Sequence, residues 1–198
     1  MQPAEIAALK QAIAARADLE KIEVYFELLM VENKAVNLVS RETTLADLIR
    51  LTAESLFPLE HLKTARGRYL DVGSGGGFPA VPLIVAGQGR ESAILLERTL
   101  KKVDALNRII RRLDIRAEAV QADFPNDSPE LQFDLITLRY VKLTPRILQA
   151  ALDHLAAEGR FVYYGAPEFD LAGHVQATHA FEPVQGNPVK QVTIFQKR

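Results

Sequence analysis

A run of glycines in the first half of the chain could hold a ligand through its backbone. The run follows the apolar segment 69–72, which contains Asp71, and reads Gly73-Ser74-Gly75-Gly76-Gly77-Phe78-Pro79. Because such a turn carries little side-chain bulk, backbone N–H groups and the start of a following helix can approach a ligand closely. If segment 69–72 is a strand of a parallel sheet, the turn lies beyond its carboxyl end, where open α/β sheets bind ligands. We expect the following residues to contact that ligand: Gly73, Ser74, Gly75, Gly77 and Phe78.

The spacing of the glycines and the charge of Asp71 indicate which ligand fits. A dinucleotide fingerprint has glycines in a G-x-G-x-x-G frame, but counting from Gly73 places Phe78 at the third position. A carboxylate at Asp71 would also face a pyrophosphate unfavourably, whereas it favours an ammonium group directly or through water. S-adenosyl-L-methionine carries an ammonium group and no phosphate. The loop therefore predicts this cofactor and disfavours an NAD-dependent oxidoreductase.

Two further acidic positions follow later apolar segments. Glu97 lies twenty positions after Gly77, at the end of segment 93–96, where a carboxylate can accept both ribose hydroxyls. Ala122 and Asp123 follow segment 117–120, and we expect them to contact the adenine ring. Two alternatives stay open: the glycine run taken alone fits a tight loop of any α/β protein, and Asp123 fits an ordinary turn or helix start.

Basic residues indicate where a nucleic acid could bind. Lys101, Arg108 and Arg112 fall on one face of a predicted helix, and the segment from Arg98 to Arg116 holds seven basic residues and two acids. Such a stripe could neutralise phosphates, although a solvated helix face is the alternative.

A second basic position follows the apolar segment 133–138. Arg139 at this strand end could donate to a base or a phosphate, and Tyr140 could stack on a base. Two motifs of other chemistries are missing. Without an Asn-Pro-Pro-Tyr motif, methylation of an exocyclic amine is disfavoured, and without G-x-S-x-G a hydrolase is unsupported.

The elements that must position these residues follow from the hydrophobic pattern. Residues 1–62 are predicted to be helical, because apolar residues recur there at helical spacing. Thr44 and Asp47 are expected to form a capping box at the start of the third helix. We expect the inner face of that helix to hold Leu45, Leu48, Ile49, Thr52 and Leu56. This extension could be a substrate-docking lid or a plain cover of the sheet. From Arg68 onward, apolar segments alternate with helical patterns, as in a parallel sheet with crossover helices. Strands are expected at 69–72, 93–96, 117–120, 133–138, 160–164, about 179–183 and 189–195, and helices at about 79–87, 99–113 and 145–156.

These elements predict an α/β fold with a mostly parallel seven-stranded sheet and a C-terminal antiparallel hairpin, turning at Gln185–Pro188. We expect residues 1–62 to form the helical extension and residues 63–198 the cofactor-binding domain.

Composition excludes several classes of function. The chain has no cysteine, and its four histidines (His61, His154, His174 and His179) lack metal-site spacing, so we expect no metal. No signal peptide or membrane span is predicted, which favours a cytoplasmic protein without a membrane partner. We further expect a monomer. A net charge of −1 does not by itself mark a nucleic-acid binder.

Taken together, these residues resemble the bacterial 16S ribosomal RNA guanine-N7 methyltransferase family, also called the glucose-inhibited division protein B family. The resemblance covers most of the chain. The matching stretches are Tyr25 to Ser40, especially Asn37-Leu38-Val39-Ser40, then Asp71 to Pro79 with Pro82, Leu95-Leu96-Glu97 with Lys101-Lys102, Val120-Gln121, and Phe133-Asp134 with Arg139.

The resemblance implies a Rossmann-like class I methyltransferase that transfers a methyl group from S-adenosyl-L-methionine to N7 of a guanine, with ribosomal RNA or the small ribosomal subunit as partner. It further implies that Arg139 acts catalytically and that the RNA is positioned by Arg50, Lys101, Arg108, Arg112, Arg139 and Tyr140.

The chain departs from the family pattern on the presumed RNA side. Leu51 replaces a histidine, Glu54 replaces an aspartate, and Leu138 and Tyr140 flank Arg139 where the family has serine and alanine. A methyltransferase for another RNA, a small molecule or a protein, and a non-catalytic ribosome-binding relative, are the alternatives.

Overall fold

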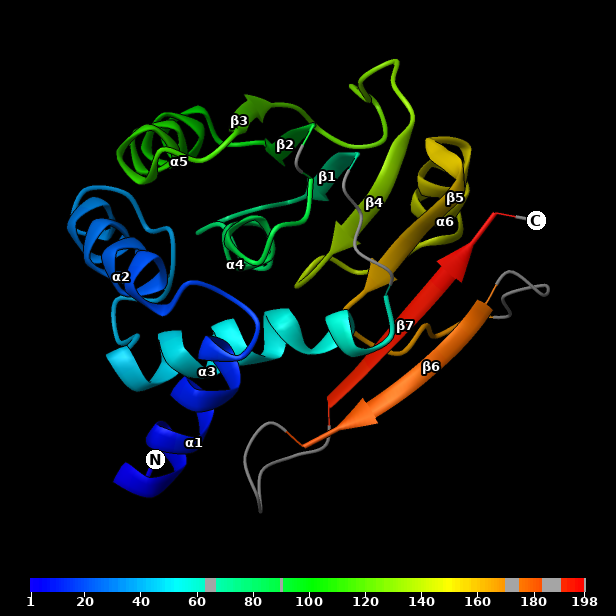
Figure 1. The fold of residues 1–198 in the computed structure, drawn as a ribbon. Helices are drawn as coiled ribbons and strands as arrows, with labels where there is room; N and C mark the ends of the chain where they lie inside the picture. Colours follow the sequence, from blue (N-terminus) through cyan, green and yellow to red (C-terminus); the bar gives the residue numbers. More distant parts are fainter. Residues whose placement is uncertain (63–66, 90, 170–174, 183–189, 198) are drawn as a thin grey trace.

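The computed structural model describes residues 1–62, 67–89, 91–169, 175–182 and 190–197 (Figure 1). Three helices and a short 3-10 helix come first: α1 Pro3–Ala14, α2 Leu19–Asn33, α3 Leu45–Leu56 and η1 Phe57–Glu60. Strands and helices then alternate: β1 Arg68–Val72, α4 Ala80–Val85, β2 Ser92–Glu97, α5 Leu100–Leu113, β3 Ala117–Gln121, β4 Phe133–Leu138, α6 Pro145–Asp153, β5 Leu155–Tyr163, β6 Val175–Phe181 and β7 Lys190–Gln196.

The strands form one seven-stranded sheet in the order β3-β2-β1-β4-β5-β7-β6. Strands β1 to β5 pair in parallel, whereas β7 pairs antiparallel with both β5 and β6. The predicted α/β class, the mostly parallel sheet and the antiparallel C-terminal strands are therefore confirmed. The predicted turn at 185–188 and the predicted domain boundary after residue 62 both fall on residues outside those described.

Helices cover the two faces of the sheet unequally. One core cluster joins α1, α2, α3, α4 and α5 to buried sheet residues such as Tyr69 and Leu95. On the other face, α6 packs against Leu70, Ile136 and Phe161. Figure 1 shows α2 beside α5 and α3 running past α4, so the N-terminal helices share a core with the sheet.

The start of α3 follows the predicted capping box. The Thr44 hydroxyl accepts a hydrogen bond from the Asp47 N–H at 3.2 Å, and Asp47 Oδ2 accepts one from the Thr44 N–H at 2.9 Å. The predicted inner residues Leu48, Ile49, Thr52 and Leu56 are buried. The prediction for Leu45 is wrong: this first residue of α3 is 59% exposed and lines an open hollow together with Phe26, Met30 and Leu48.

The largest differences from the sequence-based boundaries lie in the second half of the chain, where β5 begins at Leu155 and not at 160. The helix expected to run to 156 ends at Asp153, because Leu155 starts β5 and pairs in register with Phe133. Strand β6 starts at Val175, four positions earlier than expected. In both places, strand pairing overrides the local pattern that suggested the boundary.

Candidate active site

The glycine loop connects β1 to α4 at the carboxyl end of the parallel strands. Gly73, Gly75 and Gly77 have φ values of +75°, +54° and +95°, which other residues rarely adopt. The N–H groups of Gly73 and Ser74 both donate to the Leu96 carbonyl of β2 at 2.9 Å, so the loop is tied to the neighbouring strand. A Cβ at Gly77 would lie 2.9 Å from Val81 Cγ2 and 3.1 Å from the Tyr25 hydroxyl, so this position requires glycine.

Asp71 lies behind this loop and is 1% exposed. Its Oδ2 accepts a hydrogen bond from Ser74 Oγ at 2.6 Å, and its Oδ1 accepts one from the Thr137 hydroxyl. Because Thr137 donates to Asp71, the Tyr69 hydroxyl must donate to Thr137, at 2.7 Å. Burial raises the pKa of Asp71 to about 6, although both hydrogen bonds and the charge of Arg139 act to lower it. The predicted contact with an ammonium group stays a prediction. Because Asp71 is buried, its charge would attract that group across the glycine loop.

A helix of the N-terminal extension holds the glycine loop from the other side. The Tyr25 hydroxyl, on α2, donates to the Gly76 carbonyl at 2.7 Å, and its ring contacts Phe78 with 5.4 Å between centroids. From the sequence, Tyr25 had no predicted role at the glycine loop. Its hydroxyl was the available signal, because a buried tyrosine needs a hydrogen-bond partner.

Glu97 lies where the sequence predicted, at the carboxyl end of β2 beside the loop. Its carboxylate is 9% exposed and accepts hydrogen bonds from the Gly75 N–H at 3.2 Å and the Thr99 N–H at 3.0 Å. The Ala122 N–H donates to the Glu97 carbonyl at 3.1 Å, so the third predicted contact region adjoins the second.

Asp123 is exposed and belongs to a turn: its carboxylate accepts from Asn126 Nδ2 at 3.1 Å, and its N–H donates to Asp127 Oδ2 at 3.1 Å. This geometry is that of a turn aspartate, and it leaves the predicted adenine contact as a prediction.

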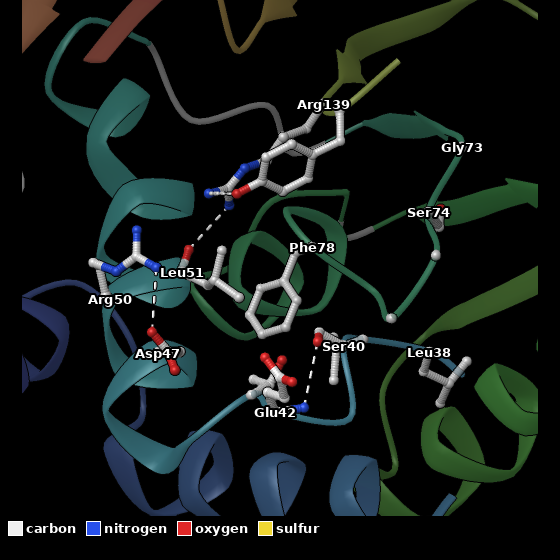
Figure 2. Close-up of a pocket in the computed structure, with 15 residues that line it drawn as sticks. Leu38, Ser40, Glu42, Asp47, Arg50, Leu51, Gly73, Ser74, Phe78 and Arg139 are labelled. Atoms are coloured by element: carbon white, nitrogen blue, oxygen red, sulfur yellow. Dashed lines mark hydrogen bonds and ion pairs between the residues drawn. The ribbon is translucent and has the colours of Figure 1, made fainter. Parts of the chain in front are cut away.

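A cavity of about 610 Å³ opens beside the glycine loop. Its walls are the loop itself, the segment 38–43 with the first turns of α3, and the pair Arg139 and Tyr140. Figure 2 shows Arg50 and Arg139 on one side, Gly73 and Ser74 on the other, and the Phe78 ring between them. The Asn33 side chain fixes the second wall, because its Oδ1 accepts hydrogen bonds from the N–H groups of Leu38 and Val39 at 2.8 and 3.0 Å. The extension therefore both covers the sheet and forms part of the cavity.

Arg139 lies directly after β4, as predicted, but its guanidinium is occupied by protein groups. It is 4% exposed, and it donates to the Leu51 carbonyl at 3.1 Å, to Ser55 Oγ at 2.8 Å and to the Glu54 carboxylate. Donation from Arg139 to a substrate stays a prediction, and it would require one of these contacts to open.

Tyr140 and Arg50 are the more accessible residues of this wall. Tyr140 is 76% exposed and has a φ of +58°, which is uncommon for a tyrosine. Arg50 forms ion pairs with Asp47 at 3.3 Å and with Glu54 at 3.2 Å. Sequence reasoning noted Glu54 only as a departure and missed its place between the two arginines. Its spacing of four residues from Arg50 on α3 was an available signal, whereas Arg139 lies in a distant segment.

The residues of the predicted basic stripe on α5 differ in whether they contact another protein group. Arg108 forms a two-pronged ion pair with Glu32 of α2, at 2.9 and 2.6 Å, which raises the pKa of Arg108 and lowers that of Glu32. Lys101 and Arg112 are exposed. In the described ranges, no cluster of three or more histidine, cysteine or acidic residues could hold a metal. None of the described helices is long and apolar enough to span a membrane.

Comparison with known sequences assigns this arrangement to one family. Residues 18–193 match the family GidB, described as rRNA small subunit methyltransferase G. The ribosomal RNA small subunit methyltransferase G of Cereibacter sphaeroides is 31% identical over 154 residues, which cover 76% of this chain and 74% of that protein. The protein of the same name from Pseudothermotoga lettingae is 30% identical over 178 residues, covering 84% of this chain and 74% of that protein.

Solved structures share the fold. An O-methyltransferase from Bacillus cereus, in complex with SAH, superposes with a TM-score of 0.64 at 17% identity, covering 88% of this chain and 91% of that chain. The T. thermophilus 16S rRNA N2 methyltransferase, in complex with AdoMet and guanosine, gives a TM-score of 0.56 at 22% identity, covering 75% and 43% of the two chains.

Proposed function

Because the chain belongs to the GidB family of rRNA small subunit methyltransferases, we propose that it transfers a methyl group from S-adenosyl-L-methionine to N7 of a guanine in 16S ribosomal RNA. The substrate is the RNA itself or the assembling small subunit. The proposal includes a monomeric enzyme that works in the cytoplasm without a metal ion.

The residues around the glycine loop fit the proposed cofactor. The loop borders the cavity with backbone free of side-chain bulk: a Cβ at Gly75 would meet no atom nearer than the Leu38 carbonyl oxygen at 3.9 Å. The cavity of about 610 Å³ lies in the range of small-molecule sites. In our assignment, Gly73, Ser74, Gly75, Gly77 and Phe78 hold the methionine end, and Asp71 supplies negative charge behind it. Glu97 accepts the ribose hydroxyls by exchanging its hydrogen bond from the Gly75 N–H for them, while Ala122 and Asp123 border the adenine.

The proposed methyl transfer requires the protein mainly to align the cofactor with the guanine. When bound, the cofactor supplies an electrophilic methyl group on a sulfonium, and guanine N7 carries an in-plane lone pair without a proton. No side chain has to remove a proton from the nucleophile. The residues of the cavity therefore act by orienting the two reactants in line and by excluding water.

We assign the RNA to the wall opposite the glycine loop. Tyr140 is exposed there and can stack on an extruded base, and Arg50 can donate to the base or to its phosphate. Arg139 adds positive charge beneath Tyr140, with a guanidinium centre 4.8 Å from the ring centroid. Lys101, Arg108 and Arg112 contact phosphates farther out along α5.

The observation that carries the proposal is the cavity between the glycine loop and Tyr140, because in a chain of this family it connects the loop assigned to the cofactor with the wall assigned to the RNA. The test is to map N7-methylguanosine in 16S ribosomal RNA from a strain that lacks the protein, and then to add the purified protein and the cofactor to that RNA. We expect one modification to be absent in the strain and restored by the protein. An unchanged modification pattern would exclude the assignment.

A further inference from the structure

Glu54 is a buried acid that connects the two arginines of the substrate wall. Its side chain is 4% exposed, although glutamate rarely occupies such a position without a partner. Oε1 accepts a hydrogen bond from Arg50 Nη1 at 3.2 Å, and Oε2 accepts one from Arg139 Nη2. Each oxygen thus accepts from a different arginine, and both arginines line the cavity.

Arg139 is held rigidly by these contacts. Its Nη1 donates to the Leu51 carbonyl and to Ser55 Oγ, and its guanidinium lies between the rings of Tyr140 and Tyr164, at 4.8 and 5.4 Å from their centroids. The Tyr164 hydroxyl in turn donates to the Ser55 carbonyl at 2.6 Å. A buried guanidinium needs a charged partner, and Glu54 supplies it.

The arrangement of Tyr140 depends on Arg139. The tyrosine adopts a left-handed backbone conformation that side chains with a Cβ rarely populate, and such conformations persist only where the surroundings over-determine them. Its hydroxyl accepts a hydrogen bond from Arg139 Nη2 at 3.2 Å, and the guanidinium lies over its ring. The contacts therefore form a chain from Glu54 through Arg139 to Tyr140.

We propose that Glu54 is a positioning residue for the target base: by holding Arg139 beneath Tyr140 it fixes the aromatic wall on which the base stacks. This inference rests on the proposed function, and it makes the N-terminal extension part of the substrate site. Glu54 does not touch the substrate in this proposal, and its effect reaches the base only through Arg139 and Tyr140.

The first measurement is the single-turnover rate of methyl transfer, with cofactor and ribosomal RNA saturating. We expect Glu54→Gln to lower this rate at least about tenfold, because the lost alignment acts on the chemical step, and to leave the dissociation constant of S-adenosylhomocysteine within about twofold of wild type. The matched control is Glu60→Gln, which removes the same charge from an ion pair with Arg16 in the same region of the chain. We expect the control to keep the wild-type rate.

A double-mutant cycle separates positioning from a general structural effect. If Glu54 acts through Tyr140, the rate of the double variant Glu54→Gln with Tyr140→Ala should lie within about threefold of the slower single variant. Losses that multiply would overturn the proposal, as would a wild-type rate for Glu54→Gln.

If Glu54→Gln fails to fold, Glu54→Asp replaces it in the double-mutant cycle with Tyr140→Ala, because this variant keeps the charge and only shortens the side chain. We expect about a threefold loss of rate from Glu54→Asp alone, and a double variant with Tyr140→Ala whose rate equals that of the slower single variant within experimental error. A wild-type rate for Glu54→Asp, or losses that multiply, would again overturn the proposal. If the wild-type protein itself forms no N7-methylguanosine, the proposed function fails; if it does and the cycle shows no coupling, only the role of Glu54 fails.

Discussion

Ser74 Oγ donates a hydrogen bond of 2.6 Å to Oδ2 of Asp71, so the glycine loop closes onto the carboxylate that precedes it. Thr137 of β4 donates to the other carboxylate oxygen. The loop, β1 and β4 therefore meet at one buried acid, whose pKa is raised to about 6 by burial. The charge of Asp71 then changes close to neutral pH, and this makes its contribution measurable.

Asp71→Asn should reveal that contribution in the free energy of unfolding. The pKa of Asp71 is higher in the folded chain than its ordinary value of 3.8, so the folded state binds more protons and stability falls as pH rises through about 6. We expect the stability of wild type relative to Asp71→Asn to decrease by up to about 3 kcal/mol between pH 4 and pH 8, at 1.36 kcal/mol per pKa unit. Urea unfolding at several pH values measures this difference. A difference independent of pH would show that Asp71 titrates normally.

Glu97→Ala should weaken cofactor binding, because its carboxylate lies beside the loop and can exchange backbone hydrogen bonds for ribose hydroxyls. Calorimetry with S-adenosylhomocysteine should show a loss of roughly 1–3 kcal/mol. Glu91→Ala is the control, since Glu91 is exposed and paired only loosely with Arg68 at 3.5 Å. An unchanged dissociation constant for Glu97→Ala would mean that Glu97 only holds the glycine loop and does not bind the cofactor.

The α5 residues should separate into two groups when RNA binding is measured against salt concentration. Lys101→Ala and Arg112→Ala should each reduce the salt slope by roughly 0.7–0.9, the value for one phosphate contact. Arg108→Ala is compared with Glu32→Ala, which breaks the same ion pair and leaves the arginine in place. If both variants weaken RNA binding equally, Arg108 acts through its ion pair with α2 and our assignment of a phosphate contact is wrong.

The rate of methyl transfer should be nearly independent of pH from about 6 to 9 when both substrates saturate, because N7 has no proton to lose and arginines do not titrate in this range. Saturating cofactor removes the effect of Asp71, because a bound ammonium group favours the charged carboxylate and lowers its pKa. Single-turnover measurements across this range test the expectation. A tenfold rise with an apparent pKa near 7 that disappears on mutation of one histidine or carboxylate would contradict a base-free mechanism, and with it N7 as the acceptor.

The sequence by itself determined those features whose signal is local. The glycine loop was recognisable because its conformation requires glycine at the alternate positions 73, 75 and 77, and Glu97 because the paired strand β2 ends at the same sheet edge as β1. The capping box of α3 and the buried face of α5, with Val103, Leu106, Ile110 and Leu113, follow from spacing within one turn of helix. Boundaries set by strand pairing, such as the start of β5, were less accurate.

Only the tertiary structure decided what surrounds the charges. Tyr25 reaches Gly76 across 51 positions, and Glu54 reaches Arg139 across 85, and no periodicity within one element reports such contacts. Two basic residues of α5 also differ in their contacts. Arg108 forms an ion pair with Glu32, whereas Lys101 is exposed and forms no ion pair within the described part of the chain. Whether a charged side chain meets solvent, a ligand or a buried partner depends on packing between distant segments, because desolvation and pairing are properties of the assembled core.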